Sequence, residues 1–128
     1  MLKAKKIKYA LLSVWNKEGI SDLAKSLIKL GFKIVSTGGT AKTLIGDGIK
    51  ITPIEKITGN PESFDGRMKT ISFEIESGIL YDRKNPSHTR QAKHLKVPRI
   101  DVVVCNLYPF EKTVSDKHVK LDAAVENI

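Results

Sequence analysis

A glycine pair between two threonines is the feature of this sequence most suited to binding an anion. The segment Lys33–Lys42 runs from a short β-branched stretch into Thr37, Gly38, Gly39 and Thr40. Adjacent glycines allow a ligand to approach the backbone N–H groups closely, because neither residue has a Cβ atom. A helix that begins there adds unpaired N–H groups and a favourable dipole, and the two hydroxyls add donors. The pattern predicts a phosphate-binding turn, with a plain tight turn as the alternative.

Apolar periodicity predicts the elements that must hold this turn. Buried strands are expected at 9–14, 32–36, 49–52 and 100–107, and helices at 20–30, 40–45, 87–95 and from Val119 onward. Asn16 is expected to cap the first helix, and Gly31 to end it. Strands that alternate with helices predict an α/β fold, a three-layer parallel sheet with helices on both faces. The segment 54–90 shows no clear pattern beyond turn residues.

Three polar side chains stand where three of these strands end. Ser13, Thr37 and Asn106 are far apart in the sequence, but each follows an apolar stretch. Ligands of parallel sheets bind beyond the carboxyl ends of the strands. The three residues are therefore expected to converge on one site with the glycine turn.

Composition indicates a globular protein with an anionic partner. Of 128 residues, 41% are hydrophobic and 28% charged, and no apolar run is long enough to cross a membrane. The net charge is +8, and the first 50 residues hold ten lysines against three acidic residues. A small anion fits this excess better than nucleic acid does, because aromatic residues are only 6% of the chain. For Lys3, Lys5, Lys6 and Lys8 a solvated surface is the simpler interpretation.

Cysteine and histidine usage gives no evidence of a disulfide or a metal site. The single cysteine, Cys105, cannot form an intrachain disulfide, so a reducing, cytoplasmic location is expected. Cys105 lies in an apolar run and is expected to pack as a small hydrophobic residue. His88 and His94 lack the spacing of metal ligands.

An ordered set of short motifs resembles one known family. The motifs are Ser13-Val14 with Lys17 and Gly19, Ser36–Lys42, Ile57–Gly59, Gly66–Thr70, Gly78–Leu80, Cys105–Phe110 and Glu126–Ile128. They resemble the amino-terminal, IMP cyclohydrolase domain of bifunctional AICAR transformylase/IMP cyclohydrolases. The motifs occur in family order and span nearly the whole chain. The resemblance implies a methylglyoxal-synthase-like fold, with residues 1–128 as a single domain that stops before the family's C-terminal end.

The resemblance also implies an activity and its substrate. It implies a hydrolase acting on cyclic amidines, which in the biosynthetic direction closes formyl-AICAR to IMP with loss of water in purine biosynthesis. Such a reaction needs orientation, stabilisation of an oxyanion and proton transfer, but no cofactor or metal. The implied partners are the purine mononucleotide and a second copy of the chain, in a homodimer.

The family pattern implies roles for particular residues. Lys69 is expected to polarise the formyl oxygen, with Tyr108 as a hydrogen-bonding group beside it. The other contacts to the nucleotide are expected from Ser13, Asn16, Lys17, Thr37, Gly38, Gly39, Thr40, Arg67, Thr70 and Asn106. Ile71–Ser77 departs from the family, which usually has a His-Pro pair and a second histidine there. The alternative function is a non-catalytic module on the same fold that binds a phosphorylated metabolite.

Overall fold

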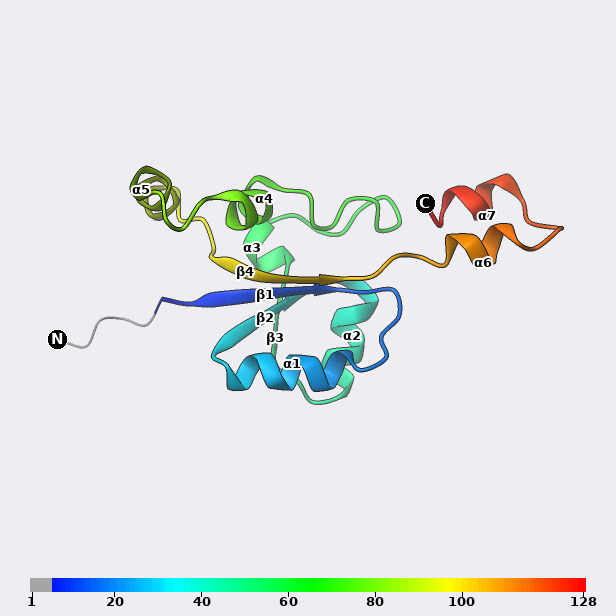
Figure 1. Ribbon diagram of the computed structural model, residues 1–128, viewed down its shortest axis with the longest axis horizontal. Coiled ribbons are helices and arrows are strands. Elements are labelled where there is room, and N and C mark those ends of the chain that lie inside the picture. The colour runs from blue at the N-terminus through cyan, green and yellow to red at the C-terminus, as the bar shows by residue number, and fades with distance from the viewer. Residues whose placement is uncertain (1–5) are drawn as a thin grey trace.

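The protein is built on a four-stranded, all-parallel sheet with helices on both faces (Figure 1). The computed structural model describes residues 6–128, so Lys3 and Lys5 lie outside the described residues. The elements follow one another as β1 (Lys8–Ser13), α1 (Ile20–Lys29), β2 (Phe32–Ser36), α2 (Gly38–Gly46), β3 (Ile51–Pro53), α3 (Glu55–Thr58), α4 (Phe73–Leu80), α5 (Pro86–His94), β4 (Ile100–Cys105), α6 (Phe110–Val114) and α7 (Leu121–Val125). The strand order is β3-β2-β1-β4. The predicted α/β fold with a parallel sheet is confirmed.

The central strand β1 explains why the sheet needs helices on both sides. Its side chains alternate between the two faces. Ala10 and Leu12 pack with buried residues of α1 and α2, whereas Leu11 packs on the opposite face with Ile54 and Ile75. Because both faces are covered, the strand is apolar throughout, as parallel strands commonly are.

Helix α1 has one buried face and begins differently from the prediction. Ile20, Ala24 and Leu27 are buried against the sheet, and Gly31 follows the helix with a left-handed φ of 86°. The prediction that Asn16 caps this helix is wrong. Gly19 occupies the N-cap position with φ 73°, and the side chain of Asn16 instead accepts a hydrogen bond from the backbone of Glu18 at 3.0 Å.

The segment without a clear sequence pattern contains α3 and α4 and the start of α5. The hydroxyl of Ser72 caps α4 by accepting a hydrogen bond from Ile75 N at 3.2 Å. Gly78 lets α4 approach β4, since a Cβ atom at this position would lie 2.7 Å from the carbonyl oxygen of Pro98. The segment Ile71–Ser77, which departs from the family pattern, therefore contains the cap and the first part of a helix that packs on the sheet.

A half-buried arginine, Arg83, fastens the end of α4 to the edge of the sheet. The Arg83 guanidinium donates hydrogen bonds to the carbonyl oxygens of Gly78, Ile79, Tyr81 and Ile100. It also pairs with Asp101, whose other partner is Arg99 at 2.8 Å. Burial acts to raise the pKa of Asp101, but the hydrogen bond from Arg99 and the charges of the two arginines outweigh it and lower the pKa overall.

Strand β4 is an edge strand, and this corrects two predictions. Ile100–Leu107 was expected to be a buried strand, but the strand ends at Cys105 and its residues alternate between covered and exposed. Cys105 is exposed rather than packed in the core. The reason is that α4 covers β4 near Ile100, where Ile75 packs, and leaves Val103 and Cys105 open on that face.

The chain beyond β4 leaves the sheet. In Figure 1, α6 and α7 lie side by side at one end of the molecule, away from the sheet. The helix predicted from Val119 onward is a short one, α7. Among residues 6–128, none of the helices has both the length and the apolar character that a membrane crossing requires.

The close approach at Gly78 can be tested by adding a methyl group. Gly78→Ala is expected to destabilise the protein by about 1–3 kcal/mol, because the Cβ atom meets a backbone carbonyl and Ile100. Gly46→Ala in α2 is the matched control, since a Cβ atom there meets nothing within 4 Å. Urea unfolding of both variants measures the difference, and equal midpoints would show that α4 is not packed as described.

The arginine pair around Asp101 predicts a pH-dependent contribution to stability. A carboxyl whose folded-state pKa lies below its unfolded value stabilises the fold above the unfolded value and loses this contribution as the pH falls through the folded value. Asp101→Asn is expected to be less stable than wild type at neutral pH by about 1–3 kcal/mol. This difference is expected to shrink below pH 3.8, the ordinary value for the group. Urea unfolding across this range measures it, and a difference that does not change with pH contradicts the assignment.

Candidate functional site

A cavity of about 320 Å³ opens at the carboxyl ends of the strands, and we call it the strand-end cavity. It lies where the strand order reverses, because β2 and β4 flank β1 on opposite sides. Parallel sheets commonly bind ligands at such a point. The residues that line the cavity come from four separate segments: Ser13, Val14, Trp15, Lys17, Thr37, Gly39, Thr40, Gly66, Lys69, Asn106 and Tyr108.

The strand-end cavity brings together most of the residues predicted from the sequence. Those that line it are Ser13, Lys17, Thr37, Gly39, Thr40, Lys69, Asn106 and Tyr108. Those outside its lining are Asn16, Gly38, Arg67 and Thr70. The Arg67 guanidinium turns instead to Glu126 beyond α7, with which it forms an ion pair.

The amino end of α2 opens toward this cavity. The helix begins at Gly38, two residues earlier than predicted, so the glycine pair is part of its first turn. Gly38 has φ 54°, a left-handed conformation that favours glycine. The first backbone hydrogen bond of the turn runs from Ala41 N to Thr37 O at 3.2 Å. The N–H groups of Gly38, Gly39 and Thr40 thus precede the helical ladder and remain for other acceptors.

Lys17 places a positive charge at this helix end. Its ammonium group donates to the carbonyl oxygens of Val14 and Trp15 at 3.1 and 3.0 Å. A Cβ atom on Gly39 would lie 3.3 Å from Lys17 Cε, so glycine at this position makes room for the lysine. An ammonium group has three N–H donors, and two carbonyl partners leave one for a ligand. The helix dipole and the lysine both favour a bound anion.

The threonine hydroxyls, in contrast, are occupied by protein atoms. Thr40 Oγ1 accepts from Val14 N and donates to Val14 O, both at 3.1 Å, and so ties α2 to the end of β1. Thr37 Oγ1 donates to the carboxylate of Glu62 at 3.2 Å. The donors left for a ligand at this turn are therefore backbone N–H groups rather than the hydroxyls.

Asn106 holds together the two chain segments that leave β1 and β4. Its Oδ1 accepts hydrogen bonds from the backbone N–H groups of Trp15 and Asn16, at 2.7 and 3.1 Å. Its Nδ2 donates to the carbonyl oxygen of Asn16 at 2.8 Å. The amide oxygen has two lone pairs and both are engaged, so a single Nδ2 hydrogen remains for a ligand.

A tight loop brings Lys69 to the cavity from the middle of the chain. Ser63 and Met68 exchange two backbone hydrogen bonds, at 2.9 and 3.2 Å, which close the loop. Between them Phe64, Asp65 and Gly66 all have positive φ values. Such a conformation costs roughly 1–2 kcal/mol per non-glycine residue. Strain of this kind is often found where a loop must present a functional group.

Four residues at the site are not among the predicted site residues: Val14, Trp15, Gly66 and Glu62. Trp15 and Gly66 line the strand-end cavity, and the Glu62 carboxylate lies against Gly38 and Gly66. Trp15 stands two residues after Ser13, so its position just beyond β1 could have indicated that it lines the cavity. Nothing in the sequence pattern connects Glu62 with the glycine turn, because the contact depends on how the 54–72 segment folds. Among residues 6–128, no group of histidine, cysteine and carboxylate side chains is arranged to hold a metal ion.

Comparison with known proteins identifies the family. The family described as MGS-like domain matches residues 19–128. Bifunctional purine biosynthesis protein PurH of Acetivibrio thermocellus is 49% identical over 122 residues, 95% of this chain. The PurH proteins of Ruminiclostridium cellulolyticum and Chlorobium phaeovibrioides are 48% and 50% identical over the same share of the chain. The chain belongs to the MGS-like domain family.

This chain matches only one part of each of the PurH proteins. It spans about a quarter of the length of the curated PurH proteins that it matches, 24% for Acetivibrio thermocellus, and the matching part is N-terminal. A solved structure, the crystal structure of ForH, superposes with a TM-score of 0.70 at 34% identity. That superposition covers 80% of this chain and 51% of the other.

The structural role of Asn106 can be separated from any ligand contact. Asn106→Ala removes three hydrogen bonds between the ends of β1 and β4, and a loss of about 1–3 kcal/mol of stability is expected. Asn127→Ala is the control, because the Asn127 side chain donates only to Ala123 O within the same helix region. Urea unfolding followed by Trp15 fluorescence measures both. An Asn106 variant as stable as the control would contradict the role of Asn106 in holding the two segments together.

Proposed function

We propose that this chain binds a purine mononucleotide in the strand-end cavity and closes formyl-AICAR to IMP. The observation that carries the proposal is the open amino end of α2, whose N–H groups and neighbouring Lys17 suit a phosphate group. The kinship with PurH proteins supports a place in purine biosynthesis. The cavity volume of about 320 Å³ falls within the range of about 300–1,000 Å³ usual for small-molecule sites.

The residues around the cavity divide into a phosphate end and a reacting end. Lys17 and Gly39 line the phosphate end, and Gly38 stands beside them at the start of α2. Lys69 and Tyr108 reach the same cavity from other segments and are the candidates for the reacting end. Among the described residues no carboxylate lines the cavity, but the Glu62 carboxylate lies against Gly38 and Gly66 and accepts a hydrogen bond from Thr37. The two lysines therefore also offset this neighbouring negative charge.

The proposed reaction joins two groups of one molecule. The carboxamide nitrogen attacks the formyl carbon, a C–N bond forms, and the former carbonyl oxygen gains negative charge. That oxygen then leaves as water, with one proton from the carboxamide nitrogen and one from the formamido nitrogen. In this scheme the Lys69 ammonium stabilises the developing oxyanion, and Tyr108 donates a hydrogen bond during proton transfer. The cavity walls would select the conformer in which the two groups of the same molecule are aligned for attack.

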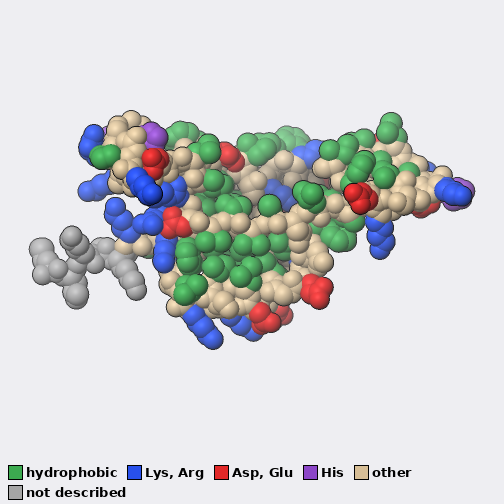
Figure 2. Space-filling view, viewed as in Figure 1, with side chains coloured by type: hydrophobic (Ala, Val, Ile, Leu, Met, Phe, Trp, Pro, Cys, Tyr) green, Lys and Arg blue, Asp and Glu red, His purple; other side chains and the backbone are tan. Residues whose placement is uncertain are grey.

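The proposal extends to location and assembly. We place the protein in the cytoplasm and expect it to act as a homodimer. Exposed apolar side chains on α6 and α7 support association, since Leu121 and Val125 are 78% and 50% exposed, and Figure 2 shows hydrophobic side chains on this end of the molecule. Sedimentation of the purified chain tests the dimer.

The catalytic role of Lys69 predicts a split between binding and turnover. Lys69→Ala is expected to lower kcat for ring closure about 10²–10⁴-fold, because an oxyanion partner acts mainly in the transition state. IMP binding, followed by Trp15 fluorescence, is expected to weaken much less, since the phosphate end is intact. Exposed Lys112 on α6 supplies the control, Lys112→Ala. Saturable IMP binding by a wild-type chain that does not turn over formyl-AICAR would establish the non-catalytic module instead.

A further inference from the structure

A second cavity lies at the opposite ends of the strands, and we call it the basic cavity. Its volume is about 540 Å³. Tyr9 near the start of β1 and Arg99 just before β4 both line it, whereas the strand-end cavity begins at Ser13. The basic cavity is therefore separated from the proposed catalytic site by the length of the sheet.

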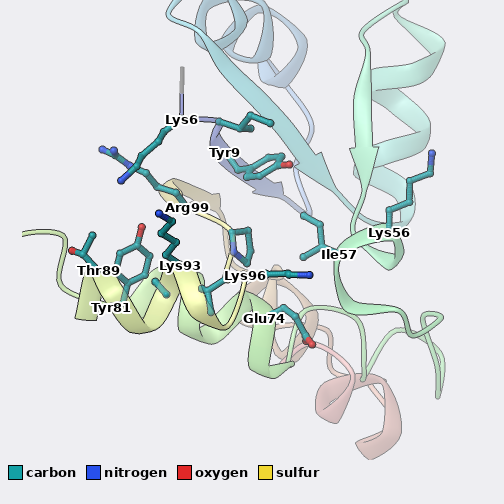
Figure 3. A pocket seen from close by; sticks show the side chains of 14 residues that line it. Lys6, Tyr9, Lys56, Ile57, Glu74, Tyr81, Thr89, Lys93, Lys96 and Arg99 are labelled. Atoms are coloured by element: carbon teal, nitrogen blue, oxygen red, sulfur yellow. The ribbon is translucent and has the colours of Figure 1, made fainter. Parts of the chain in front are cut away.

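Positive charge dominates the basic cavity. Its lining holds five cationic side chains and, among the described residues, one carboxylate, that of Glu74. Figure 3 shows Lys6, Lys93 and Arg99 gathered on one side next to Tyr81, while Lys96 extends across the hollow. Lys56 lies at the opposite rim and points away. In Figure 2, basic side chains collect at this end of the molecule, where α5 approaches the start of β1.

The charge is largely uncompensated. Arg99 is paired with Asp101, but no ion pair joins Lys6, Lys93 or Lys96 to a carboxylate within residues 6–128. All three lysines are exposed, so solvent screens much of their mutual repulsion, and a multivalent anion that contacts several of them would remove what remains. The arrangement thus favours a bound anion over an empty cavity.

The backbone at Lys96 is an independent sign that its side chain has a function. Lys96 follows α5 with φ 54°, the left-handed conformation that helix C-termini commonly give to glycine. Its N–H donates to Lys93 O at 3.3 Å, and Val97 N donates to Ala92 O at 2.9 Å, which completes the end of the helix. Glycine would adopt this conformation without strain. Lys96 adopts this strained conformation and supplies a cation to the basic cavity.

Two tyrosines, Tyr9 and Tyr81, form part of the wall of the basic cavity. The Arg83 guanidinium stacks on the Tyr81 ring at 4.2 Å from its centroid, while the same guanidinium is held by carbonyl oxygens of α4 and β4. Among the described residues, neither the Tyr9 nor the Tyr81 hydroxyl is hydrogen-bonded to a protein atom, although both tyrosines line the cavity. The two hydroxyls are further donors for an anion.

We propose that the basic cavity binds a small polyanion, a metabolite that carries at least two phosphate groups. Two groups are required because Lys6, Lys93 and Arg99 lie on one side and Lys96 reaches across, so one phosphate does not meet all of them. A small ligand is favoured over nucleic acid because the cations surround a hollow rather than follow an extended groove. The inference does not depend on the function proposed for the strand-end cavity.

Titration calorimetry of the full chain with inorganic tripolyphosphate, at physiological ionic strength, tests the proposal. Saturable binding is expected, and Lys93→Ala and Lys96→Gly are each expected to weaken it about tenfold, the loss of one charge-assisted contact. Lys96→Gly is also expected to raise the urea midpoint, because glycine relieves the left-handed backbone. A stabilised variant that loses affinity cannot be explained by misfolding.

The control variants locate the bound anion. Lys112→Ala on α6 is expected to bind tripolyphosphate as the wild type does. Binding that is lost in Lys17→Ala and kept in Lys96→Gly would overturn the proposal, and so would the absence of binding. A short single-stranded RNA or a polyglutamate peptide that binds more than about tenfold tighter than tripolyphosphate, and is sensitive to Lys96→Gly, would also overturn it, because the ligand would then be a macromolecule.

Discussion

The open first turn of α2 is the constraint on which the proposed site depends. A helix cannot satisfy its own leading N–H groups, so some other acceptor has to meet those of Gly38, Gly39 and Thr40. Thr37 forms no side-chain cap bond to them, and Gly39 and Thr40 line the strand-end cavity. The cavity exists because β4 pairs with β1 on the side opposite β2. This arrangement separates the segments that leave the ends of these strands. Topology and backbone chemistry thus place an anion-binding end and an open hollow together.

Many polar side chains near this hollow are used to build it. Asn106 fastens the β1 exit loop, Thr40 fastens α2 to Val14, and two carbonyl oxygens orient Lys17. Most of the hydrogen-bonding atoms of these side chains are already bonded to protein atoms. The result is a preorganised site in which backbone N–H groups and the lysines remain for a ligand. Such preorganisation lowers the cost of ordering the site when the ligand binds.

Local patterns in the sequence predicted the sheet and much of the cavity, while contacts between distant segments escaped them. Strands 9–14 and 32–36 were predictable because continuous apolar runs flanked by glycine and polar residues are typical of buried parallel strands. The convergence of Ser13, Thr37 and Asn106 followed from the same topology. The helix α4 was missed because its short segment lacks a clear apolar stripe, and its position depends on Gly78 meeting Pro98. The pairing of Arg67 with Glu126 was not foreseen, because it joins segments 59 residues apart. Cys105 was expected in the core because its apolar run does not reveal that β4 is an edge strand.

In the proposed complex, backbone N–H groups of the glycine turn hold the phosphate of a purine mononucleotide. Amide chemical shifts of the isotope-labelled chain during titration with IMP test it most directly. Large, saturable shifts are expected at Gly38, Gly39 and Thr40, with the same midpoint as the change in Trp15 fluorescence. Shifts confined to residues of the basic cavity, such as Lys93 and Lys96, with the glycine amides unmoved, would contradict it.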